Sequence, residues 1–144
     1  MNTMTLAQMD WDRYGNTFQK AIFETLYMVS ITLVISSILG LIIGLLLYTT
    51  RKGGILQNSV IYWVTNFLVN FIRPIPFIIL LTAIGPLTDL VVQTRIGTDA
   101  AIVGMVVAAT FGAARIFEQN LVAIDPGVIE AARSMGASPW KIIT

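Results

Sequence analysis

A single uncharged stretch sets the strongest limit on what this chain can fold into. Residues 25–50 form 26 consecutive positions without Asp, Glu, Lys or Arg. As an α-helix this stretch is roughly 39 Å long, more than the ~30 Å that the hydrocarbon core of a bilayer requires. A cleaved signal peptide has a shorter apolar region behind a basic start. The sequence therefore predicts an integral membrane protein.

The composition agrees with a membrane location and excludes several kinds of site. Of 144 residues, 56% are hydrophobic and 12% are charged, whereas about 25% are charged in an ordinary soluble domain. The chain has no cysteine and no histidine, which excludes disulfides and the ligands of most transition-metal sites. We expect no catalytic, cofactor or metal site. A net charge of +1 without a dense basic cluster gives no sign of nucleic-acid binding.

Three hydrophobic regions follow one another in what we expect to be a single membrane domain over residues 1–144. The first, 25–48, and the third, 99–115, both carry small side chains at every fourth position. These positions are Thr32, Ser36, Gly40 and Gly44 in the first region, and Ala100, Gly104, Ala108 and Gly112 in the third. A stripe of small residues lets another helix approach closely, so both helices are expected to pack against neighbours.

The second region, 53–92, combines a polar stripe with a break. Asn66 and Asn70 lie one turn apart, and Arg73 follows three residues later on an otherwise apolar helix. The two prolines directly after Arg73 each disturb helical geometry. The segment is either a plain loop between two spans or one discontinuous helix whose polar groups face a transport pathway. We favour the discontinuous helix, with these three polar residues as candidate pathway residues.

The basic residues indicate which side of the membrane is cytoplasmic. A three-span path with the N-terminus outside puts six basic residues inside and three outside. If the two prolines separate two full spans, the N-terminus moves inside and the ratio is unchanged. Both paths leave the C-terminal segment in the cytoplasm. We favour three spans, because the Asn-rich stretch is too polar to lie in lipid by itself.

Residues 125–138 are predicted to form a short helix with well-marked ends. Asp125 is a favoured N-cap, Pro126 suits the first helical position, and Gly136 suits a left-handed stop. One apolar face is formed by Val128, Ala131, Ala132 and Met135. So short a helix is marginal in water and lacks the basic face of an interfacial helix, so we expect it to dock on a protein. Ser138-Pro139 repeats the start signal and predicts another helix.

Within this segment, Glu130-Ala131-Ala132, followed after three residues by Gly136, resembles the signature loop of type I ABC importer permeases. Residues 70–81, 96–97 and 100–103 resemble the methionine-uptake permeases in particular, and the resemblance covers residues 20–144. The family loop continues with nine residues and then Ile-x-Leu-Pro. Its Ile would fall two residues beyond Thr144, so the resemblance implies an incomplete permease.

The resemblance implies an all-α transmembrane bundle with a cytoplasmic coupling helix at 125–138. Glu130, Ala131, Ala132 and Gly136 would be its ATPase-coupling residues. Two permease copies would form a homodimer in the bacterial cytoplasmic membrane, with a dimer of cytoplasmic ABC ATPase subunits and an external substrate-binding protein. ATP-driven closure of the ATPases would move the coupling helices and alternate access for an amino acid, methionine in this branch. In agreement, the sequence has no GxxxxGK[ST] loop for nucleotide.

Three alternatives are left open. A membrane-embedded enzyme would place acids, His, Cys or a nucleophile with its base inside its spans. We expect the spans to contain no acidic residue, with Asp89 near the outer end. A passive channel or assembly subunit leaves the capped cytoplasmic helix unexplained. A permease for another amino acid, apolar or polar, is the third alternative, because no residue identifies methionine chemically.

Overall fold

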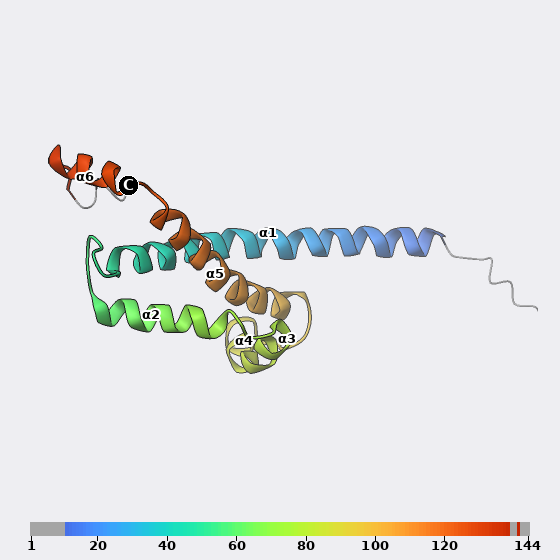
Figure 1. The fold of residues 1–144 in the computed structure, drawn as a ribbon. Helices are drawn as coiled ribbons and strands as arrows, with labels where there is room; N and C mark the ends of the chain where they lie inside the picture. Colours follow the sequence, from blue (N-terminus) through green and yellow to red (C-terminus); the bar gives the residue numbers. More distant parts are fainter. Residues whose placement is uncertain (1–10, 139–140, 142–144) are drawn as a thin grey trace, which may run out of the picture.

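The structure is a computed structural model that describes residues 11–138 and 141 (Figure 1). Within these residues the chain is helical and has no strand. The helices are α1 (Trp11–Thr50), α2 (Ser59–Ile72), α3 (Phe77–Ala83), α4 (Gly85–Val92), α5 (Thr98–Val122) and α6 (Pro126–Ser134). The expected all-α class is confirmed. Pro139, on which the prediction of a further helix depends, lies outside the described residues.

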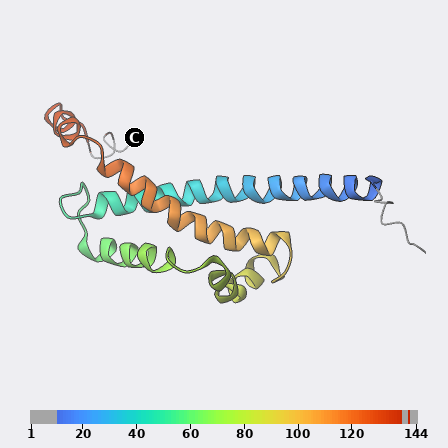
Figure 2. The same cartoon turned by 45° about the vertical axis from the view of Figure 1, so that its right-hand side comes forward.

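Helix α1 is longer than the expected 25–48, since it runs without interruption for 40 residues. No proline interrupts it, and the side chains of Lys20 and Glu24 form an ion pair of 3.8 Å along its surface, one turn apart. Figures 1 and 2 show its N-terminal part extending beyond the other helices. There it exposes large apolar side chains such as Phe18 and Phe23.

A tight connection reverses the chain between α1 and α2. The Thr50 hydroxyl donates to the Leu46 carbonyl at 2.6 Å, and the Asn58 N–H donates to the Thr50 carbonyl at 3.1 Å. The Asn58 side chain then accepts from the N–H groups of Val60 and Ile61 and caps α2. These bonds satisfy backbone groups that helix ends leave without an intrahelical partner.

The predicted break after Arg73 is confirmed. Helix α2 ends at Ile72, and α3 begins at Phe77 with its direction changed by 114°. The helix does not then continue unbroken to Val92, as expected. Ile84, with φ −88° and ψ 6°, separates α3 from α4, and Pro86 at the start of α4 favours a helix that begins there.

Helices α1 and α5 form the main packing pair, and the predicted close approach on α1 is confirmed. A Cβ added to Gly44 would lie 2.7 Å from the Phe117 Cβ, and Gly40 is equally close to Ala113. The small residues that recur at every fourth position of α5 do not all contact another helix. Gly104 faces the Leu81 side chain of α3, whereas no atom lies within 4 Å of a Cβ added to Gly112.

The core lies where α1, α2 and α5 meet. Leu47, Val69 and Ala114, one from each helix, are fully buried and pack together. The α1–α5 pair also buries the hydroxyls of Thr32 and Thr110, which have no partner in the described part of the chain. Close contact of small side chains therefore holds this pair.

The direction of α5 relative to α1 decides between the two membrane paths. Tyr27 of α1 contacts Asp99 of α5, and Gly44 of α1 contacts Phe117 of α5, so the two helices run parallel. Both are long and apolar enough to span a membrane. The segment between them must therefore cross the bilayer once, as the bent α2–α3 pair does in a three-span path.

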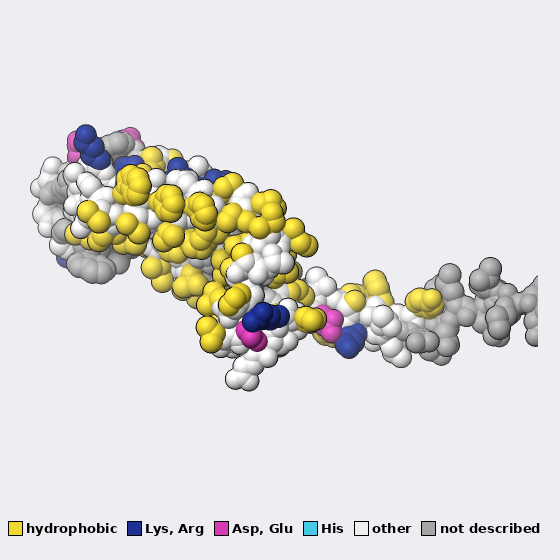
Figure 3. Space-filling view, turned by 90° about the horizontal axis from the view of Figure 1, so that it is seen from below, with side chains coloured by type: hydrophobic (Ala, Val, Ile, Leu, Met, Phe, Trp, Pro, Cys, Tyr) yellow, Lys and Arg dark blue, Asp and Glu magenta, His cyan; other side chains and the backbone are white. Residues whose placement is uncertain are grey.

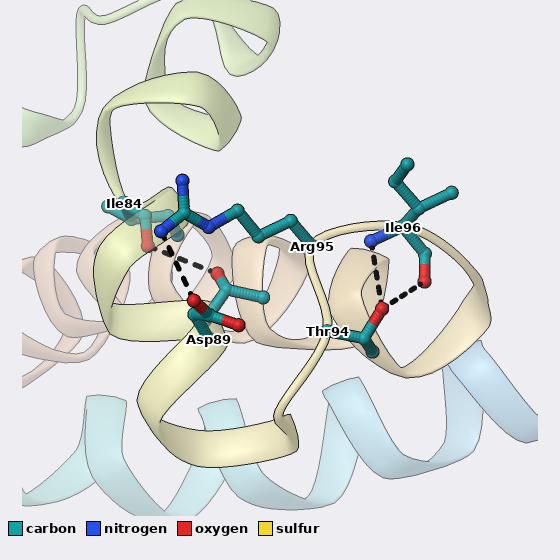
Figure 4. A network of polar contacts seen from close by, with 6 residues as sticks. Ile84, Asp89, Thr94, Arg95 and Ile96 are labelled. Carbon is teal, nitrogen blue, oxygen red and sulfur yellow. Dashed lines mark hydrogen bonds and ion pairs between the residues drawn. The ribbon is translucent and has the colours of Figure 1, made fainter.

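The surface agrees with a lipid environment. Figure 3 shows hydrophobic side chains over most of the bundle face seen from below, with charged side chains toward its ends. The connection from α4 to α5 is polar (Figure 4). There Arg95 Nη2 donates to Asp89 Oδ2 at 3.1 Å, and the Thr94 hydroxyl both accepts from the Ile96 N–H and donates to its carbonyl. The predicted integral membrane protein is confirmed.

Candidate functional site

The start of α6 has the predicted cap. Asp125 Oδ1 accepts from the Gly127 N–H at 2.8 Å, and the Asp125 carbonyl accepts from the Val128 N–H at 3.1 Å. A side-chain acceptor at this position satisfies a donor that the first helical turn leaves free. The carboxylate also lies at the positive end of the helix dipole. Helix α6 thus begins where the sequence predicts.

The end of α6 has the predicted left-handed glycine. Gly136 has φ +79°, and the Ala137 N–H donates back across it to the Ala132 carbonyl at 3.0 Å. The Met135 N–H donates to the Ala131 carbonyl at 3.1 Å. A bond that spans a left-handed residue in this way is typical of the Schellman stop. The exit direction of the chain therefore depends on Gly136.

Helix α6 presents its apolar residues to the outside. Val128 is 63% exposed and Met135 is 81% exposed, and Glu130 and Ala131 are also exposed. Figures 1 and 2 place α6 at the end of the bundle where α1 meets α2, apart from the packed helices. The described part of the chain therefore leaves these apolar side chains of α6 uncovered.

Only residues 123–125 separate α6 from α5. The Ala123 N–H donates to the Gln119 carbonyl at 3.1 Å, and the Ile124 N–H donates to the Leu121 carbonyl at 3.4 Å. These bonds continue the last turn of α5 almost to the Asp125 cap. The connection between α5 and α6 is therefore short and partly helical.

The predicted polar stripe on α2 is hydrogen-bonded to α5. Asn70 Nδ2 donates to Asn66 Oδ1 at 3.0 Å. The same Asn66 oxygen accepts from Arg115 Nη1 of α5 at 3.3 Å. That nitrogen also donates to Glu118 Oε2 at 2.6 Å. The four side chains form a continuous polar cluster that joins α2 to α5.

One sequence expectation changes at this cluster. The spans were expected to contain no acidic residue, but α5 continues past Arg115 to Val122, and Glu118 within it is only 6% exposed. The buried carboxylate is held by the neighbouring guanidinium, as a buried charge requires. Arg73, predicted beside the two asparagines, is exposed at the end of α2. The Arg115–Glu118 pair was missed in the sequence analysis, although its i,i+3 spacing is a signal that could have found it.

A cavity of about 450 Å³ lies between α1, α4 and α5. Its lining is apolar except for Tyr27 and Asp99, whose hydroxyl and carboxylate are 3.4 Å apart. Asn66, Asn70 and Arg73 do not line it. The candidate pathway residues therefore lie outside this cavity.

Comparison with models of known protein families gives no match. Among curated proteins, the chain is 47% identical over 121 residues to the probable D-methionine transport system permease protein MetI of Pasteurella multocida. That alignment covers 84% of this chain and 56% of the relative. It is also 43% identical over 124 residues to the D-methionine transport system permease protein MetI of Escherichia coli K12, covering 86% and 57%. The chain thus spans a little over half the length of the curated relatives it matches.

A solved structure shares the fold. A chain of the inward-facing MetNI methionine ABC transporter superposes with a TM-score of 0.82 at 43% identity, covering 86% of this chain and 57% of that one. A second crystal form of that transporter gives a TM-score of 0.80. The predicted resemblance to the methionine-uptake permeases is confirmed over this part of the chain.

Proposed function

We propose that this chain forms part of the permease subunit of an ATP-driven importer that carries methionine across the bacterial cytoplasmic membrane. The observation that carries the proposal is α6, a capped helix that leaves its apolar side exposed at one end of a membrane bundle. The likeness to methionine permeases supports the same reading. The permease supplies the path, and ATP hydrolysis belongs to a separate subunit.

In this proposal α6 is the coupling helix. It inserts into a groove of a cytoplasmic ABC ATPase subunit, with Val128 and Met135 in apolar contact. Glu130 provides a polar contact at the edge, and Ala131 and Ala132 keep the helix slim enough to approach closely. Gly136 directs the chain out of the groove, since its positive φ fixes the exit. Two permease copies engage a dimer of ATPases.

Movement of α6 then acts on the membrane path. Closure of the ATPases on ATP displaces α6, and the short connection at 123–125 passes this displacement to α5. Asn66, Asn70 and Arg73 lie on the broken α2–α3 segment and contribute to the polar lining of the pathway. An external binding protein delivers the amino acid to the outer side. Access alternates between the two sides of the membrane.

The assembled transporter tests this proposal directly. The permease is purified together with its ATPase subunit, reconstituted in proteoliposomes and supplied with the binding protein. Uptake of labelled D- and L-methionine is measured with and without ATP, beside a set of other amino acids. ATP-dependent uptake of methionine is the expected result.

Two results would change the proposal, one in its substrate and the other in its function. ATP-dependent uptake of a different amino acid would retain the permease and change the substrate. A complex without any ATP-dependent uptake would favour a membrane assembly subunit, which is the second candidate.

A further inference from the structure

We infer that Arg115 and Glu118 are positioning residues that transmit the movement of α6 to the broken α2–α3 segment. This inference rests on the proposed function and concerns how α6 is connected to the candidate pathway residues. The Arg115–Glu118 ion pair belongs neither to the coupling helix nor to the candidate pathway residues, and the inference gives it a function. The pair lies in the last two turns of α5, between α6 and α2.

The geometry makes Arg115 the only polar link between α5 and α2 that the described residues show. Its Nη1 atom donates to both Glu118 Oε2 at 2.6 Å and Asn66 Oδ1 at 3.3 Å. Glu118 is on the same helix and holds the guanidinium in place. Asn66 is on α2, and its bond to Asn70 continues the contact along that helix toward the break.

The other contact between α2 and α5 in this region is apolar and depends less on direction than a hydrogen bond does. Val69 and Ala114 pack together in the core beside the ion pair. Apolar side chains tolerate small sliding movements, because dispersion contacts have no preferred direction. A hydrogen bond weakens steeply when its angle or length changes. Displacement of α5 along its axis therefore pulls on Asn66 before it disturbs the apolar contact.

Burial makes the Arg115–Glu118 ion pair firm. Glu118 is 8% exposed and Arg115 27% exposed at the side chain, so water replaces few of their bonds. Charge-assisted bonds are roughly twice as strong as neutral ones. Removing one partner would leave an uncompensated buried charge and destabilise the fold. Replacing both with apolar residues avoids that penalty, which gives a way to separate transmission from stability.

The test is the double variant Arg115→Met with Glu118→Leu in the assembled transporter. A purely structural ion pair can be replaced by apolar residues with little loss of stability. We expect this variant to assemble with the ATPase and to hydrolyse ATP, while uptake per ATP hydrolysed falls about 5-fold or more, the lower range of measured site-to-site couplings. A wild-type ratio of uptake to hydrolysis would overturn the inference.

Asp89→Asn is the matched control. It removes the Arg95–Asp89 ion pair of 3.1 Å, which is exposed and joins no two spans. Its ratio of uptake to hydrolysis is expected to equal that of the wild type. A drop equal to that of the double variant would show that the assay reports any lost ion pair, and the inference would fail.

A second variant tests the inference if the double variant assembles poorly with the ATPase. Glu118→Gln keeps the shape of the side chain and one acceptor oxygen for Arg115, and it weakens the bond by removing the charge. A reduced ratio supports transmission, and an unchanged ratio contradicts it. The proposed function is judged separately, because it fails when the wild-type complex shows no ATP-dependent uptake.

Discussion

Gly40 of α1 faces Ala113 of α5 so closely that a Cβ added to Gly40 would lie 2.7 Å from the Cβ of Ala113. Backbone atoms of Thr110 and Ala114 lie 3.2 Å from the same point. Backbone cannot rotate away as a flexible side chain can. The separation of the two longest helices is therefore fixed by the absence of a side chain at residue 40.

Replacing Gly40 tests this contact. Gly40→Leu is expected to destabilise the folded protein by about 1–3 kcal/mol, the usual effect of overpacking. Denaturation in mixed detergent measures the change. Gly15→Leu is the control, because no atom lies within 4 Å of a Cβ at Gly15, and a helix former there is favourable. Equal stability of Gly40→Leu and wild type would contradict the close packing.

The three-span path predicts which residues are accessible from outside. The chain has no cysteine, so single cysteines are introduced at Asn16, Lys52, Ile96 and Ser134. Membrane-impermeant thiol reagents are expected to label residues 16 and 96 in intact cells. Residues 52 and 134 are expected to react only after the membrane is permeabilised. Labelling of Lys52→Cys in intact cells would refute this orientation.

Gly136 controls how the chain leaves α6. Gly136→Val is expected to weaken ATPase association, since a left-handed residue with a side chain costs about 1–2 kcal/mol and β-branching adds to it. Gly136→Asn is the matched variant, because Asn tolerates this conformation. Co-purification of the ATPase with each variant measures the difference. Full association of the Val variant would remove Gly136 from the coupling mechanism.

Glu130 is exposed in the middle of α6, too far from the first turn to interact strongly with the helix dipole. Glu130→Ala is therefore expected to leave α6 folded while losing a contact with the ATPase. Uptake per ATP hydrolysed should fall about 5-fold or more. ATPase activity and uptake are measured on the same proteoliposomes. Unchanged values in both would show that Glu130 is an ordinary solvated residue.

Arg73 stands at the break between α2 and α3 and is exposed within this chain. If it lines the pathway, Arg73→Ala lowers uptake about tenfold, the effect of losing one hydrogen bond to a charged group. Membrane expression and ATPase association are expected to stay unchanged. Arg95→Ala, at the outer connection, serves as the control. Normal uptake by Arg73→Ala would favour a simple anchor at the lipid headgroups.

Local signals in the sequence predicted the features that depend on local chemistry. The break after Arg73 follows from proline geometry, and the stop at Gly136 follows from the preference of glycine for positive φ. The close approach at Gly40 follows from helical periodicity. Each of these features can be predicted from residues that are close in the sequence or that share one face of a helix.

Which residues of two different helices meet was not predicted. The third hydrophobic region was expected to end at Arg115, and Glu118 beyond it is buried where α5 packs on α1: a Cβ added to Gly44 would lie 3.3 Å from the Glu118 nitrogen. Sequence spacing alone does not specify such pairings.

The parallel pairing of α1 with α5 has a consequence for biosynthesis. Residues 51–97 lie between the two helices, and a ribosome that adds about 5–20 residues per second needs roughly 2–9 s to make them. During that time the stripe containing Thr32 and Ser36 has no partner helix to cover it. The nascent α1 must therefore remain in the bilayer through its own hydrophobic length, which the uncharged run at 25–50 provides.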